Sequence, residues 1–367
     1  MKPRERVEAA LSHQKPDRCP FFVSFTPEFA RRLKKDLNLI DGSETHNPHG
    51  GGNLYQLETA LGQDLLVTSV GWANSYYQEP GDYTDEWGIG WRSVKYQTAY
   101  GQGRYTEVVD HPLAEDEAVE SYQSPDPERP ELYQEARKTL DKFQDDYYIC
   151  GGVVTTIFET AWALRGLDRL LLDLLEKPEL AEKILDIPFE YHLTVASRLA
   201  EMGVDMIWLG DDVGMQNSML ISPATWRKFL KPRMARFIRE IKEINPDLKI
   251  AYHSDGDIYP IIPDLIEIGL DVLNPVQPKS IDPEKLNREY GYQLSFWGTI
   301  DEQQTLPFGS PDDVREEVKS RLQTIGRDGG LILGPTHHVQ LDTPLENFWA
   351  MIETIKTHPY NKLFTGG

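Results

Sequence analysis

Short apolar segments alternate with helical segments over most of the chain. From residue 147 onward, each of six apolar runs is followed by sequence whose apolar residues have helical spacing; the runs cover 147–154, 205–212, 249–257, 271–277, 293–301 and 330–338. Two earlier apolar runs, 19–25 and 64–70, bring the number of expected strands to eight. Strands that alternate with helices across short loops are typical of parallel βαβ units. We therefore predict an α/β fold of the (β/α)8 TIM-barrel class. An open dinucleotide-binding sheet is disfavoured because no GxGxxG follows the first strand.

The rest of the pattern adds helices and one insertion. Helices are predicted at 3–13 and 158–200, and two more begin at Ser222 and Ser310, each of which precedes a proline. Residues 38–53 are rich in Gly, His and Asn and predict an exposed loop. Residues at about 70–110 alternate aromatic and polar side chains between Gly and Pro turns, which predicts a β-meander. We expect residues 1–367 to form a single barrel domain with this N-terminal β-rich insertion, whose Trp87 and Trp91 pack in a small core of their own or, alternatively, form a lid.

Composition narrows the class of partners. The chain has 38 basic and 59 acidic residues and a net charge of −21. Such a surface repels nucleic acid and anionic lipid, and it disfavours a polyanionic ligand unless a local basic pocket exists. No apolar run approaches the roughly 20 residues needed to cross a bilayer. Cys19 and Cys150 are too few for a disulfide framework and are expected to be buried. We expect a soluble cytoplasmic protein that acts on a small molecule.

Polar and ionisable residues follow nearly every expected strand of the barrel. Ligands and catalytic groups of such barrels gather at the carboxyl ends of the strands. The residues at these positions are Glu159, Asp211, Asp212, His253, Asp255, Asn274, Gln277, Asp301, His337 and His338.

The segment His253-Ser254-Asp255 has the most specific spacing among them. Alternation along an extended segment puts His253 and Asp255 on one face, which suits two ligands of one metal ion. A third ligand would come from another strand, and the best candidates lie in 334–338. The alternative is that His253 hydrogen-bonds Asp255 and that both fill polar space at the barrel mouth.

The other residues have structural alternatives as well. Asp211 and Asp212 suit a general base or a substrate anchor, or they cap the next helix. Glu159 suits an acid catalyst, or it only interacts favourably with the amino end of a helix. Asn274 and Gln277 suit substrate binding, or they fix the loop around Pro275.

Several motifs together make the chain resemble the uroporphyrinogen decarboxylase superfamily over nearly its whole length. They are Gly210-Asp211-Asp212, Ile221-Ser222-Pro223, His253-Ser254-Asp255-Gly256, Asn274-Pro275-Val276-Gln277, Trp297-Gly298-Thr299-Ile300-Asp301 and Thr343-Pro344-Leu345-Glu346-Asn347. The resemblance implies a TIM barrel. It implies one of two activities, since the superfamily contains porphyrinogen decarboxylases and zinc-dependent, corrinoid-linked methyltransferases.

The decarboxylase branch carries an arginine-rich motif just after its first strand. The matching stretch here, 20–27, contains no arginine, and the next one is Arg31. Porphyrinogen carboxylates would remain uncompensated beside an acidic protein, so this activity is disfavoured.

The methyltransferase branch binds zinc through His-x-Cys and a second Cys near the last strand. The matching positions are His253, Asp255 and His337, so the resemblance implies Zn²⁺ held by these three residues, with His338 as the alternative third ligand. One carboxylate and two neutral imidazoles leave a net charge of about +1 on the zinc site, against about zero with two thiolates and one imidazole. Such a site favours oxygen or nitrogen donors over sulfur.

These residues predict a methyltransferase that moves a methyl group between a small methylated substrate and a corrinoid. The substrate is expected to be an ether or a similar heteroatom donor. Asp212 and Glu159 are the expected catalytic residues, and the substrate contacts expected are Asp211, Asn274, Gln277, Asp301 and His338. The sequence has no Asp-x-His-x-x-Gly corrinoid motif, so the corrinoid is expected on a separate protein. A decarboxylase or lyase on a smaller carboxylated substrate and a non-catalytic small-molecule-binding barrel remain alternatives. The oligomeric state stays open, with a homodimer as one option.

Overall fold

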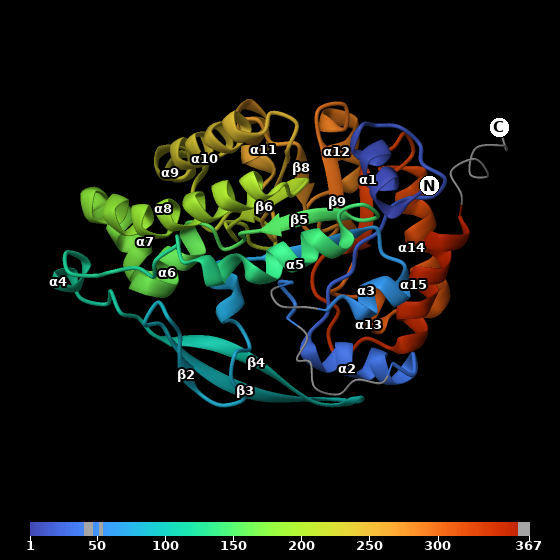
Figure 1. The fold of residues 1–367 in the computed structure, drawn as a ribbon, viewed down its shortest axis with the longest axis horizontal. Coiled ribbons are helices and arrows are strands. Elements are labelled where there is room, and N and C mark those ends of the chain that lie inside the picture. The colour runs from blue at the N-terminus through green and yellow to red at the C-terminus, as the bar shows by residue number, and fades with distance from the viewer. Residues whose placement is uncertain (40–46, 51–53, 359–367) are drawn as a thin grey trace.

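Seven parallel strands form the main sheet of the protein, which a computed structural model describes at residues 1–39, 47–50 and 54–358. The sheet curls into a barrel-like α/β fold with its helices outside (Figure 1). In their spatial order the strands are β1 Leu65–Ser69, β5 Tyr148–Gly152, β6 Met206–Gly210, β7 Lys249–His253, β8 Val272–Asn274, β9 Ser295–Ile300 and β10 Leu331–Pro335. Seven of the eight expected strands are thus confirmed.

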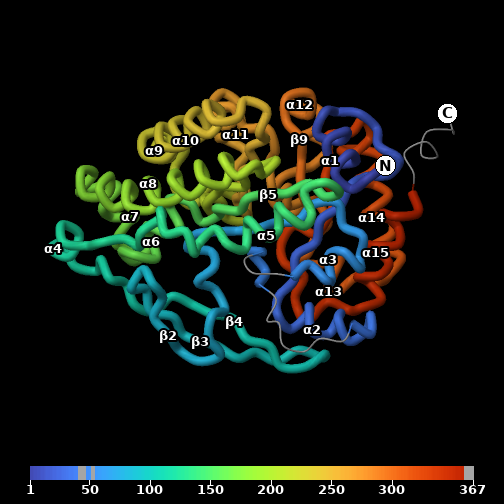
Figure 2. The backbone as a smooth tube through the Cα atoms, viewed as in Figure 1, coloured from blue at the N-terminus to red at the C-terminus, as the bar shows by residue number. Residues whose placement is uncertain are grey.

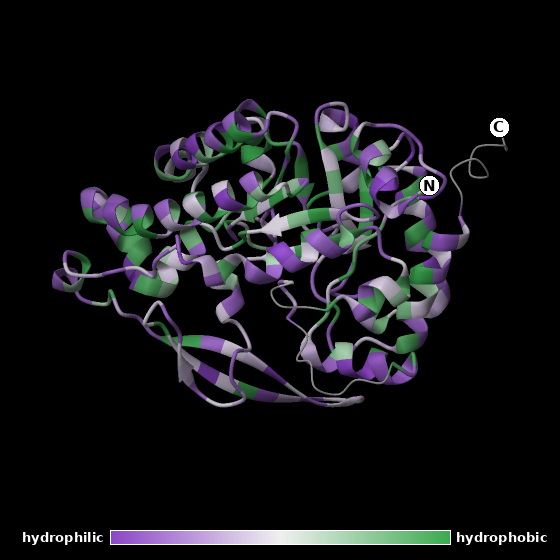
Figure 3. Ribbon diagram, viewed as in Figure 1, coloured by the Kyte–Doolittle hydropathy of each residue, from purple (hydrophilic) through white to green (hydrophobic). Residues whose placement is uncertain are grey.

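The strands are largely hydrophobic because the sheet is covered on both faces (Figure 3). Alternate residues point to opposite sides: Leu65 and Val67 join a cluster inside the barrel, whereas Leu66 packs under the outer helices. The inner cluster also holds Cys150, buried as expected, and Val7 of helix α1 (Pro3–Leu11), which covers the amino end of the barrel.

The outer layer consists mainly of helices that follow the strands. The longer ones are α2 Pro27–Asp36, α5 Gln134–Phe143, α8 Pro178–Met202, α10 Lys231–Ile244, α12 Pro283–Tyr290, α14 Pro311–Gln323 and α15 Leu345–Thr357. Shorter elements are α3 Gln56–Leu61, α4 Asp116–Val119, α9 Pro223–Phe229, α11 Ile262–Glu267, α13 Thr305–Phe308, η1 Trp72–Ser75, η2 Pro130–Tyr133 and η3 Tyr259–Ile261. Ser222 and Ser310 cap α9 and α14 as predicted, each accepting a backbone N–H.

The helix predicted over 158–200 is in fact three helices. α6 (Phe158–Arg165) ends at Gly166, whose φ of 94° lies outside the helical region. α7 (Leu167–Glu176) ends before Pro178, which starts α8. The helical spacing of apolar residues continues through both breaks. For this reason the periodicity of the sequence predicted one helix in place of three.

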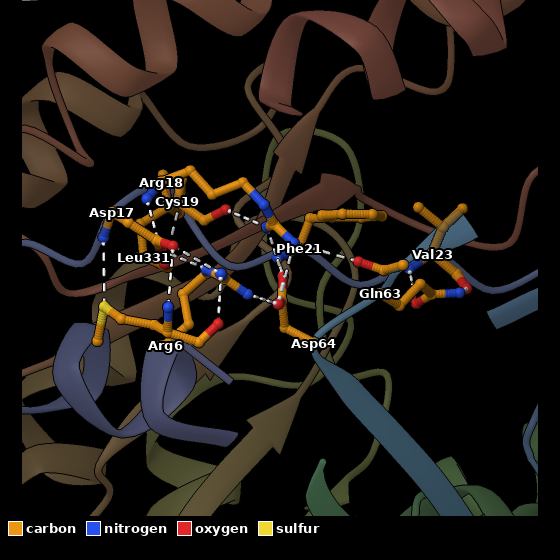
Figure 4. A network of polar contacts seen from close by, with 11 residues as sticks. Arg6, Asp17, Arg18, Cys19, Phe21, Val23, Gln63, Asp64 and Leu331 are labelled. Carbon is orange, nitrogen blue, oxygen red and sulfur yellow. Dashed lines mark hydrogen bonds and ion pairs between the residues drawn. The ribbon is translucent and has the colours of Figure 1, made fainter. Parts of the chain in front are cut away.

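The expected first strand, 19–25, occupies the eighth position of the barrel without regular strand pairing. It makes isolated parallel bridges, Phe21 with Leu333 and Phe25 with Val339. On its other side the side chain of Gln63 replaces a strand backbone, because its amide accepts from the Val23 N–H and donates to the Val23 carbonyl (Figure 4). The Asp64 N–H also donates to the Phe21 carbonyl, so one backbone hydrogen bond and the Gln63 side chain together close the barrel on this side.

Buried charged groups also stabilise this seam, the junction between segment 19–25 and β1. The Asp64 carboxylate is fully buried and lies 2.6 Å from Nη1 of both Arg6 and Arg18, and it also accepts from the Phe21 N–H (Figure 4). The amino-terminal segment also lies beside the carboxyl-terminal elements (Figure 2). One contact between them is that of the Phe25 and Phe348 rings, whose centroids are 5.9 Å apart.

The insertion forms a three-stranded antiparallel sheet of β2 (Tyr83–Thr84), β3 (Gly90–Thr98) and β4 (Gly101–Asp110), outside the main sheet (Figure 1). The prediction that Trp87 and Trp91 form a small core of their own is wrong, because both join the hydrophobic core between the barrel and its helices. Buried Asp85 accepts from the indoles of Trp72 and Trp91. His192 of α8 anchors these tryptophans to the barrel, because its ring stacks on Trp87 and accepts from the Trp72 N–H. The division into a single domain stays a prediction.

Candidate metal centre and active site

The carboxyl ends of the main strands surround a cavity of about 190 Å³. Six of the ten sequence-predicted site residues line it: Glu159, Asp212, His253, Asn274, His337 and His338. Aromatic side chains form much of the remaining wall, namely Phe22, Tyr76, Tyr77, Trp208 and Trp297. The cavity thus combines aromatic side chains with a small number of polar and ionisable groups, as small-molecule sites commonly do.

Three of the lining and neighbouring residues converge on one point. His253 Nε2 lies 3.6 Å from Asp212 Oδ1 and 4.0 Å from Asp255 Oδ1. Ligand atoms of all three lie within 4.8 Å of one another, which suits one divalent cation. Within residues 1–39, 47–50 and 54–358 this is the one such group of histidine, cysteine or carboxylate side chains.

The orientation of His253 follows from its hydrogen bonds. The Trp208 indole can only donate, and it donates to Asn274 Oδ1 over 3.1 Å. The same oxygen lies 2.7 Å from His253 Nδ1, so this nitrogen carries the proton. Nε2 is then the nitrogen that faces the two carboxylates, as in metal-binding histidines that donate their other N–H.

Tight backbone packing sets the position of Asp255. The Gly256 N–H donates to the Gln277 side chain, and a Cβ at Gly256 would come within 2.6 Å of the Gly214 backbone. Asp255 Oδ1 is buried and accepts no hydrogen bond, and burial followed by the neighbouring charge of Asp212 raises the pKa of Asp255. A buried carboxylate oxygen without a partner is costly unless it binds a cation. The three residues therefore fit a metal ion.

Two further acids lie behind Asp212. Glu159 Oε2 accepts from the Asp212 N–H, and burial, followed by the charges of Asp212 and Asp211, raises the pKa of Glu159 well above its usual range. Asp211 is buried outside the cavity, where it accepts the N–H groups of Ile157 and Glu159 at the start of α6. Burial raises its pKa to about 7. Glu159 therefore lines the cavity in surroundings that favour its protonated form, whereas Asp211 caps a helix.

The two histidines after β10 lie on the opposite wall. The His337 and His253 ring centroids are 6.4 Å apart, and His337 does not belong to the group of converging ligand atoms. His338 Nδ1 hydrogen-bonds Ser24 Oγ over 2.7 Å. The place that sequence reasoning gave to His337 is thus taken in the geometry by Asp212, and a role of His337 as ligand stays a prediction.

Gln277 and Asp301 lie away from the cavity wall. Gln277 supports the turn after Asp255 through Gly256. Asp301 is buried and accepts from the Gln303 N–H at the start of the next turn. Substrate contact by these two residues, and by Asp211, stays untested, and their observed contacts are structural.

Sequence reasoning missed His49 and the tyrosines of the insertion. His49 lies in the segment predicted as an exposed loop, yet it lines the cavity, and burial lowers its pKa to about 3. Residues 40–46 and 51–53 of that loop lie outside the described residues. Tyr76 and Tyr77 enter the cavity from the start of the insertion, and no strand-end rule points to such residues.

Comparison with known proteins assigns the family. Residues 94–358, more than half of the chain, match the family described as Uroporphyrinogen decarboxylase (URO-D). The chain belongs to the URO-D family. This URO-D family member is also similar over its full length to the solved structure of a methyltransferase from Methanosarcina mazei, with a TM-score of 0.70, 22% identity and coverage of 97% of this chain and 98% of that one. That likeness confirms the fold.

Relatives of the URO-D family member include both activities of the resemblance. It is 29% identical over 179 residues to methylcobamide:CoM methyltransferase MtaA of Methanosarcina barkeri, over 48% of this chain and 49% of that protein. It is 22% identical over 256 residues to uroporphyrinogen decarboxylase of Crocosphaera subtropica, over 68% of this chain and 70% of that protein. The match thus spans about half the length of the methyltransferase. In the described part of the chain, every helix is too short or too polar to cross a membrane.

Proposed function

We propose that this protein is a metal-dependent methyltransferase that moves a methyl group between a small methylated substrate, an ether or similar heteroatom donor, and a corrinoid carried by a separate protein. The observation that carries the proposal is the convergence of Asp212, His253 and Asp255 at the cavity. The similarity to a methylcobamide:CoM methyltransferase supports the reaction class. The sequence lacks an Asp-x-His-x-x-Gly motif, which supports a separate corrinoid protein as partner.

Asp212, His253 and Asp255 would hold the metal, for which Zn²⁺ is the proposed ion. Bound there, the ion would act as a Lewis acid toward the heteroatom of the substrate. Two carboxylates and a neutral imidazole leave a net charge of about zero on a zinc site, lower than the value of about +1 expected with His337 as a ligand. What distinguishes this ligand set from thiolates is its hardness, which favours oxygen and nitrogen donors.

The neighbouring residues divide the remaining tasks. Glu159 would donate a proton to the heteroatom as the methyl group leaves, since burial raises its pKa and favours the protonated carboxyl. Asn274 is a positioning residue, since it fixes the proton on His253 Nδ1. His337 and His338 face the same cavity as further donors to the substrate.

Porphyrinogen decarboxylation is disfavoured by the same cavity. No lysine or arginine belongs to its described lining, and Phe22 and Ser24 occupy the wall where an arginine-rich segment would follow the first strand. A substrate with many carboxylates would find no cation there.

Metal titration of the purified protein tests the proposal. We expect one zinc per chain and its loss in His253→Ala, while His358→Ala, at the end of α15, keeps it. Asn274→Ala should weaken zinc binding by about 10- to 100-fold without removing a ligand.

Two outcomes would redirect the proposal. Zinc binding unchanged in His253→Ala would refute the site, and a folded protein without zinc affinity would favour a non-catalytic binding barrel. Retention of the zinc-loaded protein on an immobilised corrinoid protein would separate methyl transfer from metal-assisted lyase chemistry, which needs no such partner.

A further inference from the structure

A second cleft, of about 340 Å³, lies between the barrel mouth and the small sheet. The barrel side consists of Thr26, His337, His338 and Gln340, and the insertion contributes Tyr77, Tyr96, Arg104 and Tyr105. Tyr77, His337 and His338 line both this cleft and the cavity beside the metal centre. The cleft therefore directly adjoins the cavity and is the neighbouring space for the distal part of a longer substrate.

The charge of this cleft is opposite to that of the protein. The chain carries a net charge of −21, yet no carboxylate belongs to the described lining of the cleft, and Arg104 supplies a permanent cation. Two carboxylates lie near the cleft without lining it: Glu28, whose charge reaches Tyr77 and Tyr96, and Asp342, whose charge reaches Tyr96. The cleft is thus a local basic pocket in an acidic molecule.

Arg104 is held in place and still has donors to offer. Its guanidinium donates to the backbone carbonyls of Glu79 and Tyr77, so two of its five N–H groups are used, and it pairs with no carboxylate among the described residues. Tyr77 has a φ of 62°, uncommon for a bulky residue, and the Arg104 bond to its carbonyl supports this conformation. Tyr77 and Tyr96, whose pKa values burial raises to about 12, remain neutral hydrogen-bond donors beside the cation.

We propose that this cleft is a subsite for an anionic group, a carboxylate, on the same substrate whose methyl group lies in the cavity, and that Arg104 determines this specificity. A planar guanidinium with free N–H groups matches a carboxylate in charge and shape. The inference rests on the proposed function, because it states which chemical group lies at the end of that substrate farthest from the methyl group.

Matched pairs of small methyl ethers test the subsite on the full-length protein. The probes are methoxyacetate, 3-methoxypropanoate and 4-methoxybutanoate, each against its carboxamide of the same shape, with binding measured by calorimetry. We expect at least one acid to bind 10-fold or more tightly than its amide. Arg104→Gln should reduce this preference to less than threefold, whereas Arg104→Lys should retain part of it.

Arg92→Gln is the matched control, since Arg92 lies on the neighbouring strand β3, faces Glu107 and does not line the cleft. It should leave the preference unchanged. The inference is overturned if wild-type protein binds no acid more tightly than its amide, or if the preference survives in Arg104→Gln. It is overturned as well if Arg104→Gln weakens acid and amide equally, since Arg104 then only supports the loop. If the protein binds no zinc but still prefers the acid to the amide, the proposed function is refuted and the carboxylate subsite is not.

Discussion

At the scale of single residues, Asn274 shows how one hydrogen-bond donor, the Trp208 indole, sets the orientation of the other groups in the site. The Trp208 indole fixes the amide of Asn274, and the amide fixes the proton on His253. Asn274 was expected to contact substrate, and its side-chain hydrogen bonds with other described residues all join parts of the barrel. The sequence predicts that His253 and Asp255 lie together, because they are two residues apart on one strand end. It does not predict that Asp212 joins them, since that depends on the spacing between β6 and β7.

The close approach of these strands has a residue-level cause. Gly210 ends β6 with a φ of 151°, and a Cβ there would come within 2.1 Å of the His253 carbonyl oxygen. Any side chain at this position would push the His253 backbone away from Asp212. A glycine before two aspartates in the sequence is compatible with many turns, so its role is visible only in the fold.

His192 gives the protein a predictable sensitivity to acid. Burial lowers its pKa from 6.5 to about 4, so the unfolded chain binds a proton at His192 more readily than the folded chain between these values. The contribution of His192 to stability is present above pH 6.5 and is lost as the pH falls toward 4. We expect a loss of about 3 kcal/mol between pH 7 and pH 4 from this group.

Urea unfolding at several pH values measures this contribution. His192→Gln should be less stable at pH 7 but should depend less on pH between 4 and 6.5 than wild-type protein. His358→Ala, near the carboxyl terminus, should keep the wild-type slope. Parallel slopes for wild type and His192→Gln would contradict the assignment.

At the scale of elements, the seam between the segment 19–25 and β1 is where the structure departs most from the sequence prediction. The apolar run was correctly placed in the barrel, but it includes Pro20, which lacks an N–H for a strand ladder. Beside one backbone hydrogen bond, from the Asp64 N–H to the Phe21 carbonyl, the side chains of Gln63 and Asp64 supply the rest of the pairing. The hydrophobic pattern predicts that the segment is buried. It does not predict that some of its backbone hydrogen bonds are made by side chains.

Replacement of Gln63 tests this seam. Gln63→Leu leaves the N–H and carbonyl of Val23 buried without partners, so we expect a loss of about 2–4 kcal/mol in the free energy of unfolding. Gln134→Leu, on the exposed side of α5, should change it by less than about 0.5 kcal/mol. Equal effects of the two substitutions in urea unfolding would show that the Gln63 amide does not hold the barrel closed.

At the scale of the whole molecule, the barrel was predictable and the position of the insertion was not. Strand–helix alternation is a local pattern, and the right-handed connection of parallel strands then leaves few arrangements. The insertion has a recognisable strand pattern, but its place beside the barrel mouth follows from contacts such as His192 with Trp72, which join residues far apart in sequence. Tyr76, Tyr77 and Arg104 therefore could not be assigned to the site beforehand.

Shortening the β3–β4 hairpin tests whether the two parts are independent. Val94 and Tyr105 are paired, so Asn-Gly in place of 95–104 gives a two-residue turn and removes Tyr96 and Arg104. Trp87 and Trp91 remain in place, and we expect stability to change by about 1 kcal/mol or less. Zinc affinity should stay within about threefold of wild type, while the preference for carboxylate ethers is lost. A large fall in zinc affinity would show that the hairpin is part of the metal centre.

The residues beside the reacting atoms come from the barrel strands, whereas the cation that we assign to the far end of the ligand comes from one stretch between β1 and β5. A change confined to the β3–β4 hairpin should therefore alter which molecules the proposed subsite accepts and leave the metal centre intact. Relatives with the same barrel and a different hairpin would be donors for chimeras, which test whether this hairpin alone sets the ligand preference.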